Sequence, residues 1–108
     1  MAHWHIIFAS EEVAKEFMKL PTDIRARFDR IVGLIESFGL RRVGMPYVRQ
    51  VQGKIWEMRA PGREGSGRSL YAAVSGQRVV ILRSFLKKTR KTPRKELAIA
   101  LQRLKEVE

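Results

Sequence analysis

Residues 79–93 read VVILRSFLKKTRKTP, and the rest of the chain is organised around this stretch. The apolar run at its start is typical of a buried β-strand. The cations that follow lie where that strand reaches the surface. Thr92 is expected to cap the next helix, and Pro93 fits its first turn. A strand and a helix would then hold a positive patch between them, which predicts a site for a phosphate backbone.

The composition indicates one small domain with a polyanionic partner. The 108 residues, 44% of them hydrophobic, are enough for one core, so we expect a single domain over residues 1–108. The 22 Lys and Arg residues outweigh 11 Asp and Glu, and the formal net charge of +11 favours nucleic acid, an acidic protein or an anionic surface as partner. The absence of cysteine excludes disulfides and thiolate metal sites, and it fits a reducing cytoplasm.

Neither a secretion signal nor a membrane span is expected. The first residues lack the basic flank that precedes the apolar core of a signal peptide. No apolar run approaches the ~20 residues that a membrane-spanning helix needs.

Two helices are expected before the middle of the chain. Ser10 offers an N-cap, and Glu11 and Glu12 follow where the helix dipole favours acids. The second helix has the clearest periodicity in the sequence and is expected to end at Gly39. Its apolar stripe consists of Ile24, Phe28, Ile31, Ile35 and Phe38. Two such helices form a hairpin that needs a sheet to cover.

Four strands are expected, over residues 3–9, 54–60, 68–74 and 79–85. We interpret residues 40–53 as a loop, with a short strand over 47–51 as an alternative, and residues 61–67 as a flexible connection. The last helix runs from Pro93 to about Lys105. The order β-α-α-β-β-β-α predicts an α+β fold, in which a small antiparallel sheet carries an N-terminal helical hairpin on one face and a C-terminal helix.

The basic residues gather in two intervals that contain no acid. The interval between Glu64 and Glu96 is the longer one, and the other lies between Glu36 and Glu57. Their basic residues are Arg68, Arg78, Arg83, Lys87, Lys88, Arg90, Lys91, Arg94 and Lys95 in the first, and Arg41, Arg42, Arg49 and Lys54 in the second. Both intervals are expected at the open sheet face and its rim. The alternative is a solvated surface without a partner.

Three segments resemble the RelE/ParE toxin superfamily, and in particular its phage-derived, HigB-like branch. They read KIWEMR (54–59), GRSLY (67–71) and VILRSFLKKTRKTP (80–93), and the resemblance runs from about residue 20 to the end. It implies the RelE-like fold and a toxin of a type II toxin–antitoxin pair. Such a toxin is a metal-independent endoribonuclease that needs no cofactor, cuts mRNA on the ribosome and so inhibits translation.

The resemblance also implies the partners and the location. The partners are mRNA, the ribosome and a cognate antitoxin with an acidic segment and a helix-turn-helix DNA-binding domain. The protein would act in the cytoplasm and away from membranes.

Carried onto this chain, the resemblance implies a site on neighbouring strands and the segment before the last helix. The catalytic candidates are Arg68, Lys87, Lys88, Lys91 and Glu57. The candidates for RNA contact are Lys54, Arg59, Tyr71, Arg83 and Arg90. The sequence departs from the family pattern at Arg83, where many members have histidine. Both histidines of this chain lie in the first strand, so no histidine acts beside the basic residues.

RNA cleavage of this type uses the 2′-hydroxyl of the RNA as nucleophile. The protein must supply a base, stabilise charge on the phosphorane and protonate the leaving oxygen. Arg68 and Lys87 suit the phosphate. Crowding by Lys88 and its basic neighbours is expected to lower the pKa of Lys87, so either Lys87 or Glu57 serves as the base, with Tyr71 as a possible proton donor. Replacing Arg68 or Lys87 with alanine is then expected to abolish growth arrest and to leave the fold intact.

Each of these roles has a structural alternative. Glu57 and Arg59 can pair with other charges, and Arg68 can be the structural partner of Glu57. Tyr71 can be a packing residue. Arg83 can lie on the side of Val79, Ile81 and Phe85 and anchor an acidic antitoxin segment instead of RNA.

Two other functions fit the same fold. One is a ParE-like inhibitor of DNA gyrase, which needs no cations beside the sheet. The other is a non-catalytic phage protein that binds nucleic acid. The concentration of cations favours the endoribonuclease.

Overall fold

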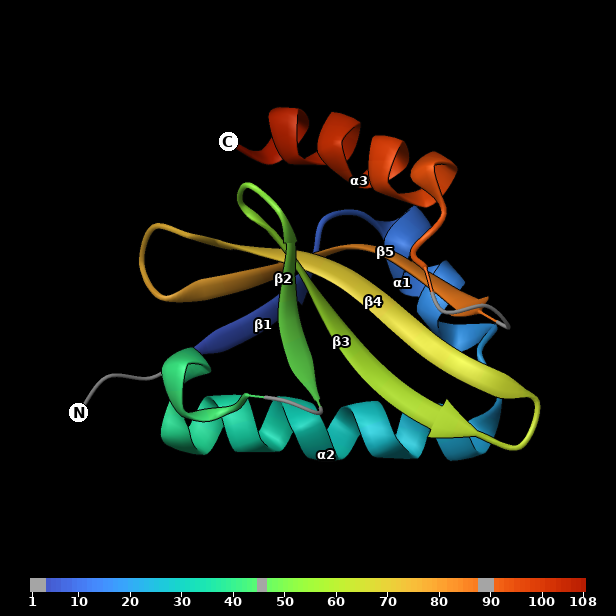
Figure 1. Ribbon diagram of the computed structural model, residues 1–108. Coiled ribbons are helices and arrows are strands. Elements are labelled where there is room, and N and C mark those ends of the chain that lie inside the picture. The colour runs from blue at the N-terminus through green and yellow to red at the C-terminus, as the bar shows by residue number, and fades with distance from the viewer. Residues whose placement is uncertain (1–3, 45–46, 88–90) are drawn as a thin grey trace.

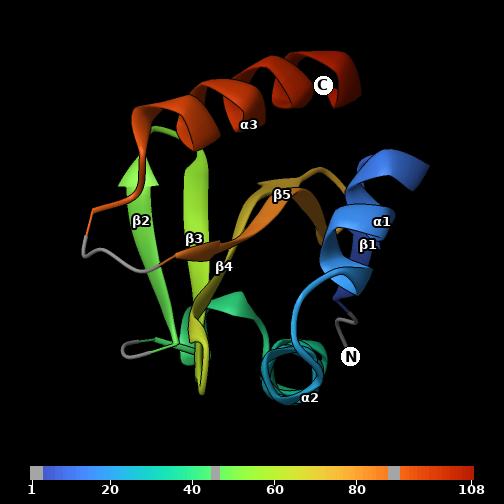
Figure 2. The same ribbon diagram turned by 90° about the vertical axis from the view of Figure 1, so that its right-hand side faces the viewer.

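A computed structural model describes residues 4–44, 47–87 and 91–108. These residues form a five-stranded sheet with helices on both of its faces, as Figure 1 and Figure 2 show. In chain order the elements are β1 (His5–Phe8), α1 (Glu11–Met18), α2 (Thr22–Phe38), the 3-10 helix η1 (Leu40–Arg42), β2 (Val48–Gln52), β3 (Ile55–Gly62), β4 (Gly65–Val74), β5 (Arg78–Lys87) and α3 (Arg94–Val107). This is the α+β class expected from the sequence. Within these ranges no helix combines the length and apolar character that crossing a membrane requires.

The two N-terminal helices follow their local signals. The Ser10 hydroxyl oxygen accepts a hydrogen bond from the Val13 amide at 3.3 Å, as an N-cap does. The stripe on α2 is confirmed over Ile24, Phe28, Ile31 and Ile35, which are all buried. The last expected member, Phe38, is 58% exposed. Gly39 ends α2 with a φ of +84°, a conformation that glycine adopts without strain.

The sheet has the order β1-β5-β4-β3-β2 and is mixed. β1 pairs with β5 in parallel, and all other neighbouring strands are antiparallel. The parallel pair is possible because α1 and α2 follow β1 in the chain and separate it from the later strands. β2 forms in the stretch interpreted mainly as a loop, where a strand was the alternative. β3 and β4 are longer than expected and leave only residues 63–64 between them.

β5 carries one extra residue opposite β4. Leu70 pairs with Arg83 and the next residue of β4 pairs with Ile81, so Leu82 forms a β-bulge. A bulge interrupts the alternation of side chains between the two sheet faces. Ile81 therefore packs under α1 and α2, whereas Arg83 and Phe85 lie on the face of Leu70, toward α3. The expectation that Arg83 shares a face with Ile81 is wrong for this reason.

α3 covers the sheet face opposite α2, and Figure 2 shows the two helices on either side of the strands. Ala100 and Leu104 of α3 pack on Leu70 and Leu82 in a second apolar core. Pro93 is the N-cap residue, and no side chain caps the helix. Thr92 was expected in that role, but its hydroxyl donates instead to the carboxylate of Glu57.

Candidate functional site

The sheet face toward α3 carries four basic side chains around one carboxylate. Strand pairing sets Arg49 of β2 opposite Glu57 of β3, and Arg59 of β3 opposite Arg68 of β4. Lys87 lies on the neighbouring strand β5, on the same face. We call Arg49, Arg59, Arg68 and Lys87 the basic cluster.

Glu57 is the centre of the cluster and is 0% exposed. Arg68 donates from Nη1 to Oε1 at 2.6 Å, Arg49 donates from Nε to the same oxygen at 3.3 Å, and the Thr92 hydroxyl donates to Oε2. Burial alone would raise the pKa of Glu57, but the Thr92 hydrogen bond and the charges of Arg68 and Arg49 outweigh it and hold the pKa below its ordinary value. A carboxylate with both oxygens engaged and a lowered pKa is better suited to orienting Arg68 than to accepting a proton.

Arg68 is held on two sides and is itself buried. Besides its bond to Glu57, it donates from Nε to the Ser66 hydroxyl at 3.1 Å. Its residue exposure is only 3%, whereas the Arg49 side chain is 40% exposed. Arg68 therefore belongs to the floor of the site, and Arg49 to its rim.

Lys87 also belongs to the floor, since it is 4% exposed. Burial is the main effect that lowers the pKa of Lys87, and the positive charge of Arg68 adds to it; Glu57 partly offsets them, and Arg49 and Arg59 lower the pKa further. A lowered pKa of Lys87 was expected from the sequence, but from crowding by Lys88 and its basic neighbours. The causes in the structure are burial and the arginines of the neighbouring strands. A lysine with a lowered pKa can exchange a proton with substrate nearer neutral pH than an ordinary lysine.

The structure thus brings together Arg68, Lys87, Glu57 and Arg59 among the residues expected from the sequence. Arg68 also forms an ion pair with Glu57, which is the structural role that the sequence offered as an alternative for Arg68.

Tyr71 is not part of this group. It is fully buried on the opposite face, in the core under α1 and α2. Its hydroxyl oxygen has no hydrogen-bond partner within the described part of the chain, and burial raises the pKa of Tyr71 above its ordinary value. These surroundings fit the alternative that Tyr71 is a packing residue.

Lys54 and Arg83 also lie apart from the cluster. Lys54 precedes β3 and pairs with Glu108 at 2.7 Å on the surface. Arg83 donates from Nη1 to Glu16 of α1 at 2.6 Å and pairs through Nη2 with Glu96 of α3 at 3.2 Å. These ion pairs tie β5 to both helices, so Arg83 is already engaged by carboxylates.

The segment before α3 is described only in part. Lys88 and Arg90 lie outside the described residues. Lys91 is exposed and directly precedes Thr92, whose hydroxyl reaches Glu57. Lys91 is therefore close in sequence to a residue that contacts the site.

Two residues of the site were not identified as such from the sequence. Arg49 was noted only as a basic residue of the 40–53 stretch, although a strand there would have placed it near Glu57 by pairing. Thr92 was interpreted as a helix cap. No local signal distinguishes a cap from a donor to a distant carboxylate.

The chain is similar to one protein family and to several solved structures. The profile of the family described as Phage derived protein Gp49-like (DUF891) matches residues 15–105. No curated protein sequence matches the chain significantly. Among solved structures it is similar to a mutant of the E. coli toxin RelE in the free state, with a TM-score of 0.58 and 18% identity over 96% of this chain and 99% of that chain.

A second solved structure is similar to the same degree. It is a chain of the archaeal RelE–RelB complex from Pyrococcus horikoshii OT3, with a TM-score of 0.56 and 20% identity over 78% of this chain and 94% of that chain. At these identities the two likenesses concern the fold. Taken with the family match, they identify the chain as a member of the phage-derived Gp49-like family with a RelE-like fold.

Proposed function

We propose that the protein is the toxin of a type II toxin–antitoxin pair and an endoribonuclease that cuts mRNA on the ribosome. The observation that carries this proposal is the basic cluster, held on one sheet face around the buried carboxylate of Glu57. Membership in a phage-derived family with a RelE-like fold supports it.

The cluster supplies the groups that the reaction needs. The 2′-hydroxyl of the RNA attacks the adjacent phosphorus, and neutral Lys87 accepts its proton. Arg68, oriented by Glu57, and Arg59 beside it stabilise the phosphorane charge. The bond to the 5′-oxygen breaks, and protonated Lys91 returns a proton to that oxygen. The products are a 2′,3′-cyclic phosphate and a 5′-hydroxyl end.

The ribosome is part of the proposal because the reaction needs alignment. The attacking oxygen, the phosphorus and the leaving oxygen must lie in line, and holding them so can supply several kcal/mol of the barrier reduction, on the order of 7–11 kcal/mol in well-oriented systems. Arg68 and Lys87 are buried, and this favours a substrate that the ribosome holds against the site.

A cognate antitoxin is the second partner. The comparison structure from P. horikoshii is a RelE–RelB complex, and it supports a protein partner for this chain as well. A formal charge of +11 suits an acidic segment, as the sequence analysis expected. An enzyme that acts on mRNA and ribosomes works in the cytoplasm.

Primer extension on mRNA from cells that briefly express the protein tests the function. We expect cuts in phase with codons, and we expect them to disappear in Lys87→Ala. Lys105→Ala is the matched control, because it removes an exposed lysine of α3 far from the cluster in sequence. Purified ribosomes with message, compared with message alone, then test the dependence on the ribosome.

Two outcomes would overturn the proposal. Growth arrest with DNA breaks and intact mRNA would favour a gyrase inhibitor. Arrest with neither breaks nor cuts would favour a protein that only binds nucleic acid.

A further inference from the structure

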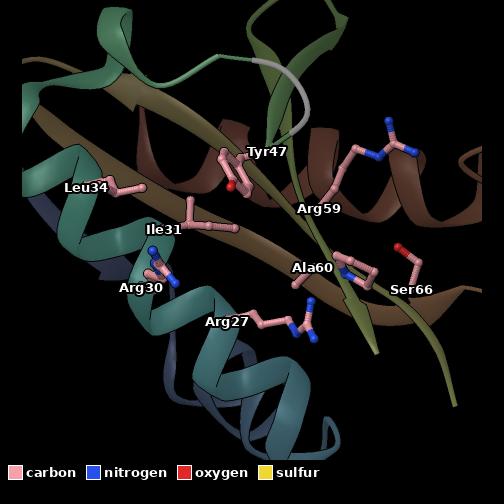
Figure 3. Close-up of a pocket in the computed structure, with 9 residues that line it drawn as sticks. Arg27, Arg30, Ile31, Leu34, Tyr47, Arg59, Ala60 and Ser66 are labelled. Atoms are coloured by element: carbon pink, nitrogen blue, oxygen red, sulfur yellow. The ribbon is translucent and has the colours of Figure 1, made fainter. Parts of the chain in front are cut away.

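A groove lies between α2 and the edge of the sheet, next to the basic cluster (Figure 3). It encloses about 580 Å³, within the range of roughly 300–1,000 Å³ typical of small-ligand sites. The last pair of β2 with β3 is Val48 with Met58, and the Arg59 amide also donates to the Tyr47 carbonyl; beyond Arg59, within the described residues, the outer edge of β3 forms one wall of the groove. The lining residues are Arg27, Arg30, Ile31, Leu34, Tyr47, Arg59, Ala60, Pro61 and Ser66.

The groove combines an apolar floor with cations and one aromatic ring. Ile31 and Tyr47 provide apolar surface, and Tyr47 is 45% exposed although its backbone is fixed by hydrogen bonds to β3 and Gly44. Figure 3 shows Arg27 and Arg30 on α2, with Tyr47 on the other side of the groove. No described carboxylate forms an ion pair with either arginine. Their charge is therefore uncompensated within the described part of the chain.

The groove and the basic cluster adjoin each other across β3. Arg59 and Ser66 both line the groove. Arg59 is itself a member of the basic cluster, and the Ser66 hydroxyl accepts a hydrogen bond from Arg68 at 3.1 Å. In Figure 3 the Arg59 side chain points away from α2, toward the other face of the strand. An RNA strand that crosses the edge of β3 would pass from the groove directly to the basic cluster.

We propose that this groove binds a nucleotide of single-stranded RNA next to the phosphate that is cut. The base stacks on Tyr47 over the apolar floor, as unpaired bases stack on aromatic side chains. Arg27 and Arg30 contact the flanking phosphates. This inference rests on the proposed function, because it assigns the substrate path through the same site.

An extended peptide fits the groove less well. A peptide that added a strand to the free edge of β3 would need the backbone donors of that edge. Pro61 lies there and has no N–H, so the ladder would lose a hydrogen bond in the middle of the groove.

Fluorescence anisotropy with a short, labelled 2′-O-methyl RNA oligonucleotide tests the proposal, because this RNA binds without being cut. We expect Tyr47→Ala to weaken binding by about tenfold, in the range measured for base stacking, and Tyr47→Phe to retain it. We expect Arg27→Ala/Arg30→Ala to weaken binding and to reduce the slope of log affinity against log salt by about one. Arg42→Ala/Arg78→Ala is the matched control, since both arginines are exposed and outside the groove.

The outcomes separate this inference from the proposed function. If mRNA is cut normally and the groove variants bind RNA like the control, the groove assignment fails alone. If no RNA is cut but the groove variants still lose affinity, the proposed function fails, and the groove binds RNA without a position beside a cleaved phosphate. If a polyglutamate peptide binds through Tyr47 and RNA binding is unchanged in Tyr47→Ala, the groove is a protein-binding site and the proposal is overturned.

Discussion

Replacing Arg68 with alanine removes the buried cation that balances Glu57. Glu57 is 0% exposed and Arg68 3% exposed, and Nη1 of Arg68 lies 2.6 Å from Oε1 of Glu57. Removing one partner of such a pair costs about 3–5 kcal/mol, because the other charge stays buried without compensation. Glu57 keeps Arg49 at 3.3 Å and the Thr92 hydroxyl, so we expect the lower end, about 3 kcal/mol.

Urea unfolding followed by the fluorescence of Trp4 and Trp56 measures this loss. With a slope of about 1.5 kcal/mol per M, the midpoint falls by about 2 M. The double variant Glu57→Leu/Arg68→Met removes both charges, and we expect its free energy of unfolding to lie within about 1 kcal/mol of the wild type. Lys54→Ala breaks an exposed ion pair and is expected to cost less than about 1 kcal/mol.

The reasoning would be refuted if Arg68→Ala unfolded at the same urea concentration as Lys54→Ala. It would also be refuted if the double variant were as unstable as the single one. The result bears directly on activity measurements. The sequence led us to expect an intact fold in Arg68→Ala, whereas the ion pair means that any loss of growth arrest must be compared at equal amounts of folded protein.

Four further predictions concern Lys87, Glu57, Thr92 and Arg83. The rate of single-turnover cleavage is expected to rise with pH and to level off below pH 10.5, because the pKa of Lys87 is lowered from that value, and Lys87→Ala is expected to abolish this rise. The pKa of Glu57 is also lowered in the folded state, so ionised Glu57 stabilises the fold above pH 4.5. This stabilisation is lost as the pH falls through the lower folded-state pKa. Urea midpoints measured between neutral and acid pH are therefore expected to drop less in Glu57→Gln than in the wild type. Thr92→Val removes a hydrogen bond to a carboxylate and is expected to cost about 1.5–3 kcal/mol in the same assay, with Thr92→Ser close to wild type. Arg83→Met is expected to lower the melting temperature while the cleavage rate per folded molecule stays unchanged; a lost rate at full folding would show instead that Arg83 contacts RNA, as the family resemblance implies.

The helices were predictable because their signals are local. The Ser10 cap, the stripe from Ile24 to Ile35 and the stop at Gly39 each depend on residues within a few turns of one another. Four of the five strands were predictable in order for the same reason, whereas β2 lies in the stretch that was interpreted mainly as a loop. The assignment of β3 side chains to the two sheet faces was also correct. Glu57 and Arg59 lie on one face of the sheet, and Trp56 and Met58 lie on the other.

The composition of the site was less predictable because it depends on long-range pairing. Arg49 joins the cluster only because β2 forms and pairs with β3. Thr92 reaches a carboxylate thirty-five positions earlier in the chain, and a threonine before a proline reads as a cap from sequence alone. The parallel pairing of β1 with β5 likewise depends on how α1 and α2 return the chain to the sheet.

The extra residue at Leu82 divides β5 into two halves of opposite phase. The first half packs alternate side chains under the helical hairpin, and the second half turns Lys87 to the face of Glu57. Deleting Leu82 would remove the bulge and leave Arg83 opposite Leu70 and Lys87 opposite Ser66, so the lysine would stay on the face of Glu57. Such a one-residue deletion is expected to be tolerated better than a deletion elsewhere in β5, where no extra residue is available to preserve the register.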